Sequence, residues 1–405
     1  MRISDLTAWH VRIPLKTTVQ HASHTRRETD SIIVRCRLVD GTIGWGEGLP
    51  REYVTGETIE SALAQLEATD LQAQLGEEIR DIGAAISVCR RLHLEDPPEE
   101  LLPAVGLRRD CFGHSARCAV ELAVLDACAR AERIPFSDIT GRFPVTMAIR
   151  HRADRARYSL AFTPKAAWKI RLRGWLLRGF GFHQAKVKVG VAGVDDVALL
   201  QLVRKSVGPR VDLRLDANEA WQCDEVVEQM TQLIPFGVTS LEQPVSHDDV
   251  AGLAKIRDEL DVPIMLDESL CSATDARRAI ESGWCDLFNI RLSKCGGFLN
   301  GLELAAMAHQ AGLGYQLGCQ VGETGILSAA GRHFATSVAG IRYLEGSFDR
   351  YLVAERLTVE DLTFGRGGYA PALPGPGLGV SVDREAIRRV EIARRDWNWQ
   401  TRVNS

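Results

Sequence analysis

The sequence predicts an α/β protein in which a barrel of parallel strands and helices is joined to a smaller α+β lobe. Two observations predict this class. From residue 158 onward, eight short apolar runs rich in β-branched residues alternate with helix-length amphipathic stretches. The residues before this point instead show a hairpin pattern followed by helical stretches. Eight units of one strand and one helix fill about 190 residues, close to the size of a (β/α)8 barrel. An open, doubly wound sheet is the alternative.

The eight predicted strands follow one another at intervals of about 24 to 28 residues, which is the length of a strand, a crossover helix and two short loops. Several of the intervening helices end at a glycine, the residue that most easily terminates a helix. The strands are predicted at residues 158–162, 185–189, 211–215, 238–241, 262–266, 286–290, 313–317 and 341–344. We therefore expect a catalytic barrel over residues 151–349.

The N-terminal lobe is expected to cover residues 1–150. A β-rich run at 31–38 is followed by the turn dipeptide Asp40-Gly41 and a returning strand at 42–47, which predicts an antiparallel hairpin. Residues 116–131 have the broad apolar face of a buried helix. The Pro- and Gly-rich chain after residue 349 predicts irregular structure that returns to this lobe, as a C-terminal segment over 350–405.

Composition excludes several classes of protein. The 405 residues are 45% hydrophobic and 25% charged, which is typical of a globular chain rather than a disordered one. A net charge of -4 argues against nucleic acid as a partner. The ten scattered cysteines form no C-x-x-C pair, and the chain shows neither a signal peptide nor a membrane-spanning run, so we expect a cytoplasmic protein with no membrane partner.

Side-chain alternation along the predicted strands places charged groups inside the barrel. Lys186 and Lys188 share one face of their strand, and the apolar residues that alternate with them, Ala185, Val187 and Val189, share the other. The next three strands each end in one carboxylate, at Asp216, Glu242 and Asp267. Because barrel active sites lie at the C-terminal ends of the strands, we expect these side chains to converge there. Any one of these carboxylates could be an ordinary solvent-exposed acid in a loop. That interpretation fits three acids at successive strand ends less well.

Three converging carboxylates need a compensating cation, because like charges raise one another's pKa. Oxygen ligands without histidine or cysteine favour Mg²⁺, with Mn²⁺ as a possible substitute. The sixth strand is followed by Lys294, which we expect at the barrel mouth opposite Lys188. A lysine on each face and a metal between them suit removal of the proton α to a carboxylate and stabilisation of the resulting enediolate.

These residues and their surroundings resemble the muconate-lactonising subgroup of the enolase superfamily. The resemblance covers nearly the whole chain. It includes the G-W-G-E-G segment that begins at Gly44, K-V-K at 186–188, D-A-N at 216–218, E-Q-P at 242–244, D-E-S at 267–269 and K-C-G-G at 294–297. It implies a modified (β/α)7β barrel under a capping lobe, and small carboxylates as substrates. It implies Asp216, Glu242 and Asp267 as Mg²⁺ ligands, Lys188 and Lys294 as acid/base residues, and Lys186 as an electrostatic aid to substrate binding.

The resemblance also implies where specificity lies. Two loops of the capping lobe select the substrate in this family, and here they correspond to residues 17–29, with His21, His24, Arg26 and Arg27, and 50–55, with Tyr53. Either arginine could bind a distal carboxylate, although a solvated basic loop fits them equally well. We further assign Asn218 and Glu323 to substrate binding and expect Glu268 to support the metal ligands. Dipeptide epimerases carry Asp-x-Asp after the last strand, whereas this chain has Glu345-Gly346-Ser347, which argues against a dipeptide substrate.

The leading hypothesis is an Mg²⁺-dependent racemase or epimerase of an N-acyl amino acid or related carboxylate. The same lysines and metal could serve a cycloisomerase of a muconate-like diacid or a dehydratase of the o-succinylbenzoate synthase type. A metal-free Schiff-base lysine enzyme and a degenerate, non-catalytic barrel are further alternatives, against which the three carboxylates and both lysines argue. The family's tendency to associate suggests a homo-oligomer.

One basic run is not explained by this chemistry. Lys169, Arg171, Arg173 and Arg178 lie on the first predicted barrel helix, among Trp168 and Trp175. This pattern could fit an anionic surface as a partner, but a solvated outer face is the expectation we favour.

Overall fold

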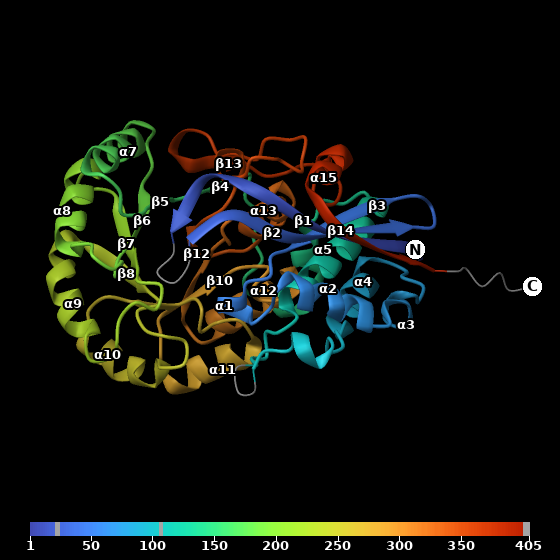
Figure 1. Ribbon diagram of the computed structural model, residues 1–405, viewed down its shortest axis with the longest axis horizontal. Coiled ribbons are helices and arrows are strands. Elements are labelled where there is room, and N and C mark those ends of the chain that lie inside the picture. Colours follow the sequence, from blue (N-terminus) through green and yellow to red (C-terminus); the bar gives the residue numbers. More distant parts are fainter. Residues whose placement is uncertain (21–24, 105–107, 400–405) are drawn as a thin grey trace, which may run out of the picture.

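The barrel is built from one curled parallel sheet of eight strands (Figure 1). The computed structural model describes residues 1–20, 25–104 and 108–399. The strands occur in sheet order from β12 to β5 and confirm all eight predicted runs: β5 Leu160–Phe162, β6 Gln184–Lys188, β7 Asp212–Asp216, β8 Val238–Glu242, β9 Ile264–Leu266, β10 Leu287–Ile290, β11 Gly314–Leu317 and β12 Ile341–Leu344. The backbone N–H of Ser159 donates to Leu344 O at 2.8 Å, which links the chain entering β5 to the end of β12.

Seven α-helices join these eight strands and cover the outside of the sheet (Figure 1). They are α7 Ala167–Gly179, α8 Asp196–Val207, α9 Val226–Leu233, α10 Leu253–Glu259, α11 Ala273–Ser282, α12 Phe298–Gln310 and α13 Gly325–Ser337. The first helix after β12 is the short α14, Asp349–Leu352. The predicted (β/α)7β arrangement is confirmed, and the open, doubly wound alternative is not observed.

The capping lobe contains a four-stranded antiparallel sheet in the order β14-β1-β2-β3. β2 Thr25–Leu38 and β3 Ile43–Gly48 form the predicted hairpin. The sequence pattern did not predict β1, Ile3–Gln20, or β14, Glu391–Asn398, which pair with each other from the two ends of the chain (Figure 1). The C-terminal segment therefore adds an edge strand to the N-terminal sheet.

Helices cover one side of this sheet. The central one is α5, His114–Ala131, which extends the predicted helix by two residues at its N-terminus. The remaining elements of the lobe and tail are α1 Glu52–Thr55, α2 Ile59–Ala68, α3 Leu71–Leu75, α4 Ile82–Arg91, α6 Asp138–Arg142, α15 Arg384–Val390, and the small pair β4 Arg155–Arg157 and β13 Tyr369–Pro371. No helix of the described residues is long and apolar enough to cross a membrane.

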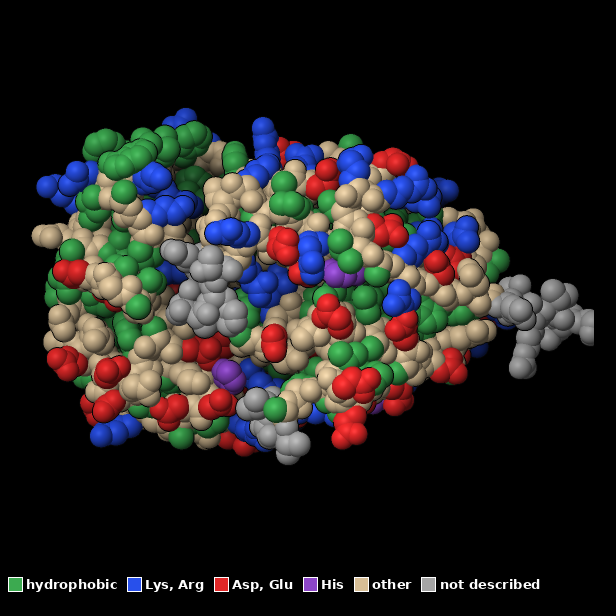
Figure 2. Space-filling model, viewed as in Figure 1, with side chains coloured by type: hydrophobic (Ala, Val, Ile, Leu, Met, Phe, Trp, Pro, Cys, Tyr) green, Lys and Arg blue, Asp and Glu red, His purple; other side chains and the backbone are tan. Residues whose placement is uncertain are grey.

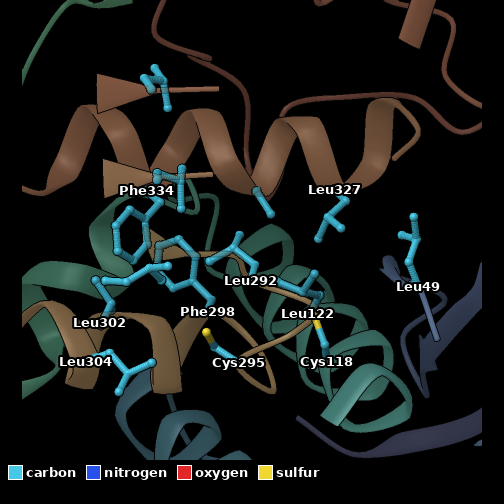
Figure 3. Packing of buried hydrophobic residues seen from close by; sticks show 14 of the residues in the cluster. Leu49, Cys118, Leu122, Leu292, Cys295, Phe298, Leu302, Leu304, Leu327 and Phe334 are labelled. Carbon is cyan, nitrogen blue, oxygen red and sulfur yellow. The ribbon is translucent and has the colours of Figure 1, made fainter. Parts of the chain in front are cut away.

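Lobe and barrel share one apolar core (Figure 3). Leu122 of α5 lies in the same packed layer as Leu292 after β10, Phe298 of α12 and Leu327 of α13. Phe298 also makes an edge-to-face contact with Phe334, with ring centroids 5.7 Å apart. Since such burial is the dominant favourable term in folding, the capping lobe is held firmly over the barrel.

A buried carboxylate adds a polar link between the two parts. Glu47 of β3 accepts hydrogen bonds from the backbone N–H of Thr324 and of Leu327, at the start of α13, and from Thr324 Oγ1. A carboxylate is stabilised at a helix N-terminus, where backbone N–H groups lack partners within the helix. Burial nevertheless raises the pKa of Glu47 to about 7. The glutamate of the G-W-G-E-G segment therefore joins the capping sheet to the barrel.

The glycines of the same segment have a packing role that yields a prediction. A Cβ at Gly46 would overlap the Ala119 carbonyl oxygen of α5. We expect Gly46→Ala to lower the free energy of unfolding by about 3 kcal/mol, since backbone must move to accept the methyl group. Gly141→Ala, where a Cβ meets nothing within 4 Å, is the matched control and should be neutral or slightly stabilising. Urea denaturation of both variants measures this, and equal stabilities would contradict it.

Candidate active site

A cavity of about 300 Å³ lies at the C-terminal ends of the barrel strands, beneath the capping lobe. Thr17, Thr18 and Val19 of β1 and Tyr53 of α1 line it from the lobe. The charged and amide side chains that line it from the barrel side are Lys165, Arg173, Lys186, Lys188, Asp216, Asn218, Arg291, Gln320, Glu323, Glu345 and Asp349. The cavity is therefore a mixed-charge site of a size suited to a small molecule.

The three predicted carboxylates lie side by side on adjacent strands. Asp216 ends β7 and is in register with Glu242, which ends β8, while Asp267 directly follows β9. All three are at most 1% exposed. Parallel strands bring them to one edge of the sheet, as the sequence pattern predicted.

Three cations balance this negative charge. Lys186 Nζ lies 3.0 Å from Asp216 Oδ2 and 3.3 Å from Glu242 Oε1. Arg291 forms an ion pair with Asp267 and lies 3.7 Å from Glu242 Oε1. Lys294 Nζ is 2.7 Å from Asp267 Oδ1. Each carboxylate is thus within reach of at least one buried or half-buried cation.

The pKa shifts follow from burial and from these pairs. Burial alone would raise the pKa of Asp216, but the ammonium of Lys186 holds it below its usual range. Burial and the charge of Asp216 raise the pKa of Glu242. Burial opposes the charge of Lys186, yet the surrounding carboxylates keep its pKa above the usual value. The carboxylates around Lys186 therefore favour its charged form, which fits the electrostatic role predicted for it.

The donor set fits a hard divalent cation. Among the described residues, no three acidic, histidine or cysteine side chains are grouped as a ready-made metal site, and cations pair with the carboxylates of the trio. Both carboxylate oxygens of the neighbouring Glu268 are fully buried without a hydrogen-bond partner among the described residues, and burial raises its pKa to about 8. Glu268 does not line the cavity. Uncompensated oxygens beside three carboxylates are a site where more positive charge would be stabilising.

Lys188 points into the cavity. Its Nζ donates to Asn218 Oδ1 at 2.6 Å, and the side chain is half-buried. Asn218 has a φ of 44° and is followed by Glu219 at 66°, conformations that residues other than glycine seldom adopt. Strained backbone of this kind is common at functional sites. Both residues lie within three positions of the end of β7. The strained backbone therefore includes Asn218, the residue that orients Lys188.

Lys294 does not reach the cavity. It follows β10 by four residues, in a turn, and its fully buried Nζ donates to the carbonyl oxygens of Asp267 and Asn289. Burial lowers its pKa. The side chain that reaches the cavity from this strand end is Arg291. Lys294 follows β10, four strands from the β6 strand that carries Lys188, and its side chain folds back onto the strand ends. Its role opposite Lys188 stays a prediction.

Only some of the residues predicted to select the substrate line the cavity. Glu323 lines the cavity, and burial raises its pKa to about 8. Tyr53 also lines it, and the guanidinium of Arg26 lies over its ring at 5.3 Å. Neither Arg26 nor the exposed Arg27 is among the lining residues. His21 and His24 lie outside the described residues.

Two further charged residues belong to the site but were not assigned a role from the sequence. Arg291 is one. Glu345, after β12, accepts from Lys186 at 2.9 Å and from Arg214 at 2.5 Å, and although burial opposes it the charge of Lys186 lowers its pKa to about 2. Period-two alternation from Asn289 to Arg291 would have placed Arg291 on the inner face, as it did Lys186 and Lys188. Glu345 directly follows the predicted strand at 341–344, so the strand-end signal that indicated Glu242 and Asp267 would have indicated it too.

Residues 3–141 match the mandelate racemase / muconate lactonizing enzyme N-terminal domain, and residues 172–386 match the enolase C-terminal domain-like family. The chain belongs to the enolase superfamily. Its relatives in this superfamily include the N-succinyl-L-Arg/Lys racemase of Bacillus cereus, 29% identical over 97% of this chain and 98% of that protein. The L-Ala-D/L-Glu epimerase of Bacillus subtilis is 29% identical over 94% of this chain and 97% of that protein.

Solved enolase-superfamily structures share the fold. The N-succinyl Arg/Lys racemase from Bacillus cereus superposes with a TM-score of 0.84 at 24% identity, over 98% of this chain and 100% of that one. The muconate lactonizing enzyme from Pseudomonas fluorescens gives 0.81 at 24% identity, over 96% and 99%. Racemases, epimerases and cycloisomerases of this superfamily thus resemble the chain along almost its whole length.

Proposed function

We propose that the protein is an Mg²⁺-dependent racemase or epimerase that removes the proton α to the carboxylate of an N-acyl amino acid or related small carboxylate. The observation that carries this proposal is the position of Lys188, which lines the cavity, pairs in register with Asp216 on the next strand, and donates to Asn218. The names of the epimerases and racemases among its relatives support the same reaction.

Asp216, Glu242 and Asp267 would hold the ion, which when bound supplies positive charge to the substrate carboxylate and so makes the α-proton more acidic. Lys188 accepts that proton at Nζ, while the Oδ1 of Asn218 orients the ammonium that forms. Lys186 keeps its proton and adds positive charge next to Asp216 and Glu242. Thr17, Thr18 and Val19 of β1 line the cavity from the side of the capping lobe.

A second candidate function needs a base on only one face of the substrate. The structure favours it through one observation, the presence of Arg291 in the cavity where a second lysine was expected. The neighbouring carboxylates raise the pKa of this guanidinium although burial opposes them, so it stays charged and stabilises an anion rather than moving a proton. Cycloisomerisation of a muconate-like diacid, or dehydration of the o-succinylbenzoate synthase type, would use Lys188 with such a cation.

Proton exchange in D2O separates the two candidates. With Mg²⁺ present, NMR of the purified protein with N-acyl amino acids, dipeptides and muconate-like diacids is expected to show α-deuteration with inversion on an amino-acid derivative. A lactone or dehydrated product without inversion would instead establish the second candidate. Absence of any exchange over the whole panel would contradict both.

The same assay tests which residue acts on the opposite face of the substrate. For a racemase we expect Lys294→Gln to exchange the α-proton of one enantiomer through Lys188 and to lose inversion, because the second proton donor is missing. Because Lys294 also forms contacts with Asp267 that support the fold, the thermal unfolding of the variant is measured together with the exchange rate. Inversion at the wild-type rate in Lys294→Gln would exclude this lysine, and Arg291→Gln would then be the variant to compare.

A further inference from the structure

Helix α7 directs large apolar side chains away from the barrel. Its inner face buries Ile170, Gly174 and Leu177 against the neighbouring elements. The outer face carries five large hydrophobic side chains, which we call the α7 ridge: Trp168, Leu172, Trp175, Leu176 and Phe180, exposed by 61%, 46%, 62%, 50% and 54%. Such exposure would cost about 25 cal/mol per Å² of apolar surface relative to burial. A face of this kind commonly marks an interaction site.

The ridge is continuous rather than scattered. Residues 168, 172, 175 and 176 follow the i, i+4, i+7, i+8 spacing that places side chains on one helix face. Figure 2 shows this face as a hydrophobic area at the upper left, over α7, with basic side chains around it. Other exposed large hydrophobics, such as Met147, Val359 and Ile392, come from separate elements.

The chain segment that contains the ridge has charged residues of one sign, although two of them, Lys186 and Lys188, line the cavity inside the barrel. From Arg155 to Val194 the sequence contains nine lysines and arginines and no aspartate or glutamate. Lys165, Lys169, Arg171 and Arg178 are exposed beside the ridge, and the ammonium of Lys169 lies over the Trp168 ring at 5.4 Å. The sequence pattern favoured a solvated outer face, but the structure turns the tryptophans outward together with the basic residues.

From these observations we infer that the α7 ridge binds the surface of an anionic phospholipid membrane. Tryptophan and other large apolar side chains beside lysine and arginine are typical of helices that lie in the headgroup region. A second copy of this chain is a poorer occupant, because pairing two α7 ridges would bring the acid-free segments of both copies together. The absence of a membrane-crossing helix among the described residues is consistent with binding at the surface.

This inference does not depend on the proposed function. It is tested by sedimentation of the full-length protein with vesicles of phosphatidylcholine, with or without phosphatidylglycerol. We expect binding to the anionic vesicles only, with a blue shift of tryptophan emission. Trp168→Gln/Trp175→Gln should lower the partition coefficient by about tenfold or more, and Lys169→Gln/Arg171→Gln by about 30-fold. Met147→Gln/Val359→Gln is the matched control, because it also removes two exposed hydrophobics and should bind as the wild type does.

Each of the following results would overturn the inference. One is failure of the wild-type protein to bind anionic vesicles in lipid excess, or equal binding to neutral ones. The other is a dimer in sedimentation velocity that dissociates in Trp168→Gln/Trp175→Gln without vesicle binding, which would assign the ridge to a second copy. Binding to polyglutamate but not to vesicles would likewise replace the membrane with an acidic protein. Circular dichroism melting of each variant shows that the fold is retained.

Discussion

Replacing Lys188 with alanine is expected to lower the rate of α-proton exchange by about 1,000-fold, which is typical of the loss of a general base. The fold should tolerate this change. Lys188 is half-buried and donates to Asn218, whereas the charge balance of the carboxylates rests on Lys186, Arg291 and Lys294. Mg²⁺ binding should therefore persist in Lys188→Ala, as measured by isothermal titration calorimetry beside the NMR exchange assay.

Lys165→Ala provides the matched control. Lys165 also lines the cavity but is exposed and lies outside the carboxylate trio. Its replacement should change the exchange rate by no more than a few-fold. Exchange at the wild-type rate in Lys188→Ala would exclude this lysine as the base and with it the mechanism proposed above. A similar loss in both variants would point to the net charge of the cavity rather than to one base.

The barrel was predictable because its signals are local. Each strand is a short apolar run, and a helix follows it after a loop. The repeat of strand and helix is therefore visible along the chain. β1 and β14 lack that advantage. Asp5 pairs with Asn398, and no property of either segment alone indicates a partner so distant in sequence. Long-range antiparallel pairing therefore became visible only in the structure.

The site was predicted as far as alternation and strand ends could take it. Lys186, Lys188, Asp216 and Glu242 each lie within a strand, and their inward direction follows from period two. Lys294 lies beyond its strand, where alternation no longer fixes direction, and its placement rested on a motif. The structure shows that its side chain instead satisfies the carbonyl oxygens of Asp267 and Asn289. Motif position thus predicted the neighbourhood of Lys294 but not its orientation.

Asp216→Asn is expected to weaken Mg²⁺ binding by about 100-fold or more. Losing a residue that merely orients a metal ligand already costs 10- to 100-fold in affinity, and loss of a ligand charge should cost at least as much. The variant should still fold, because Lys186 retains Glu242 and Glu345 as partners when Asp216 loses its charge. Titration calorimetry with Mg²⁺, and with Mn²⁺ as a second probe, measures the change.

Glu345→Gln is the control that distinguishes a metal ligand from a neighbour of Lys186. Glu345 and Asp216 lie at almost the same distance from Lys186 Nζ, 2.9 and 3.0 Å, so both substitutions remove one negative charge from the same ammonium. Only Asp216 belongs to the trio at the ends of β7 and β8 and after β9. Affinity in Glu345→Gln should therefore stay within a few-fold of the wild type. Equal weakening in both variants would mean that total negative charge, rather than the trio, determines where the cation binds.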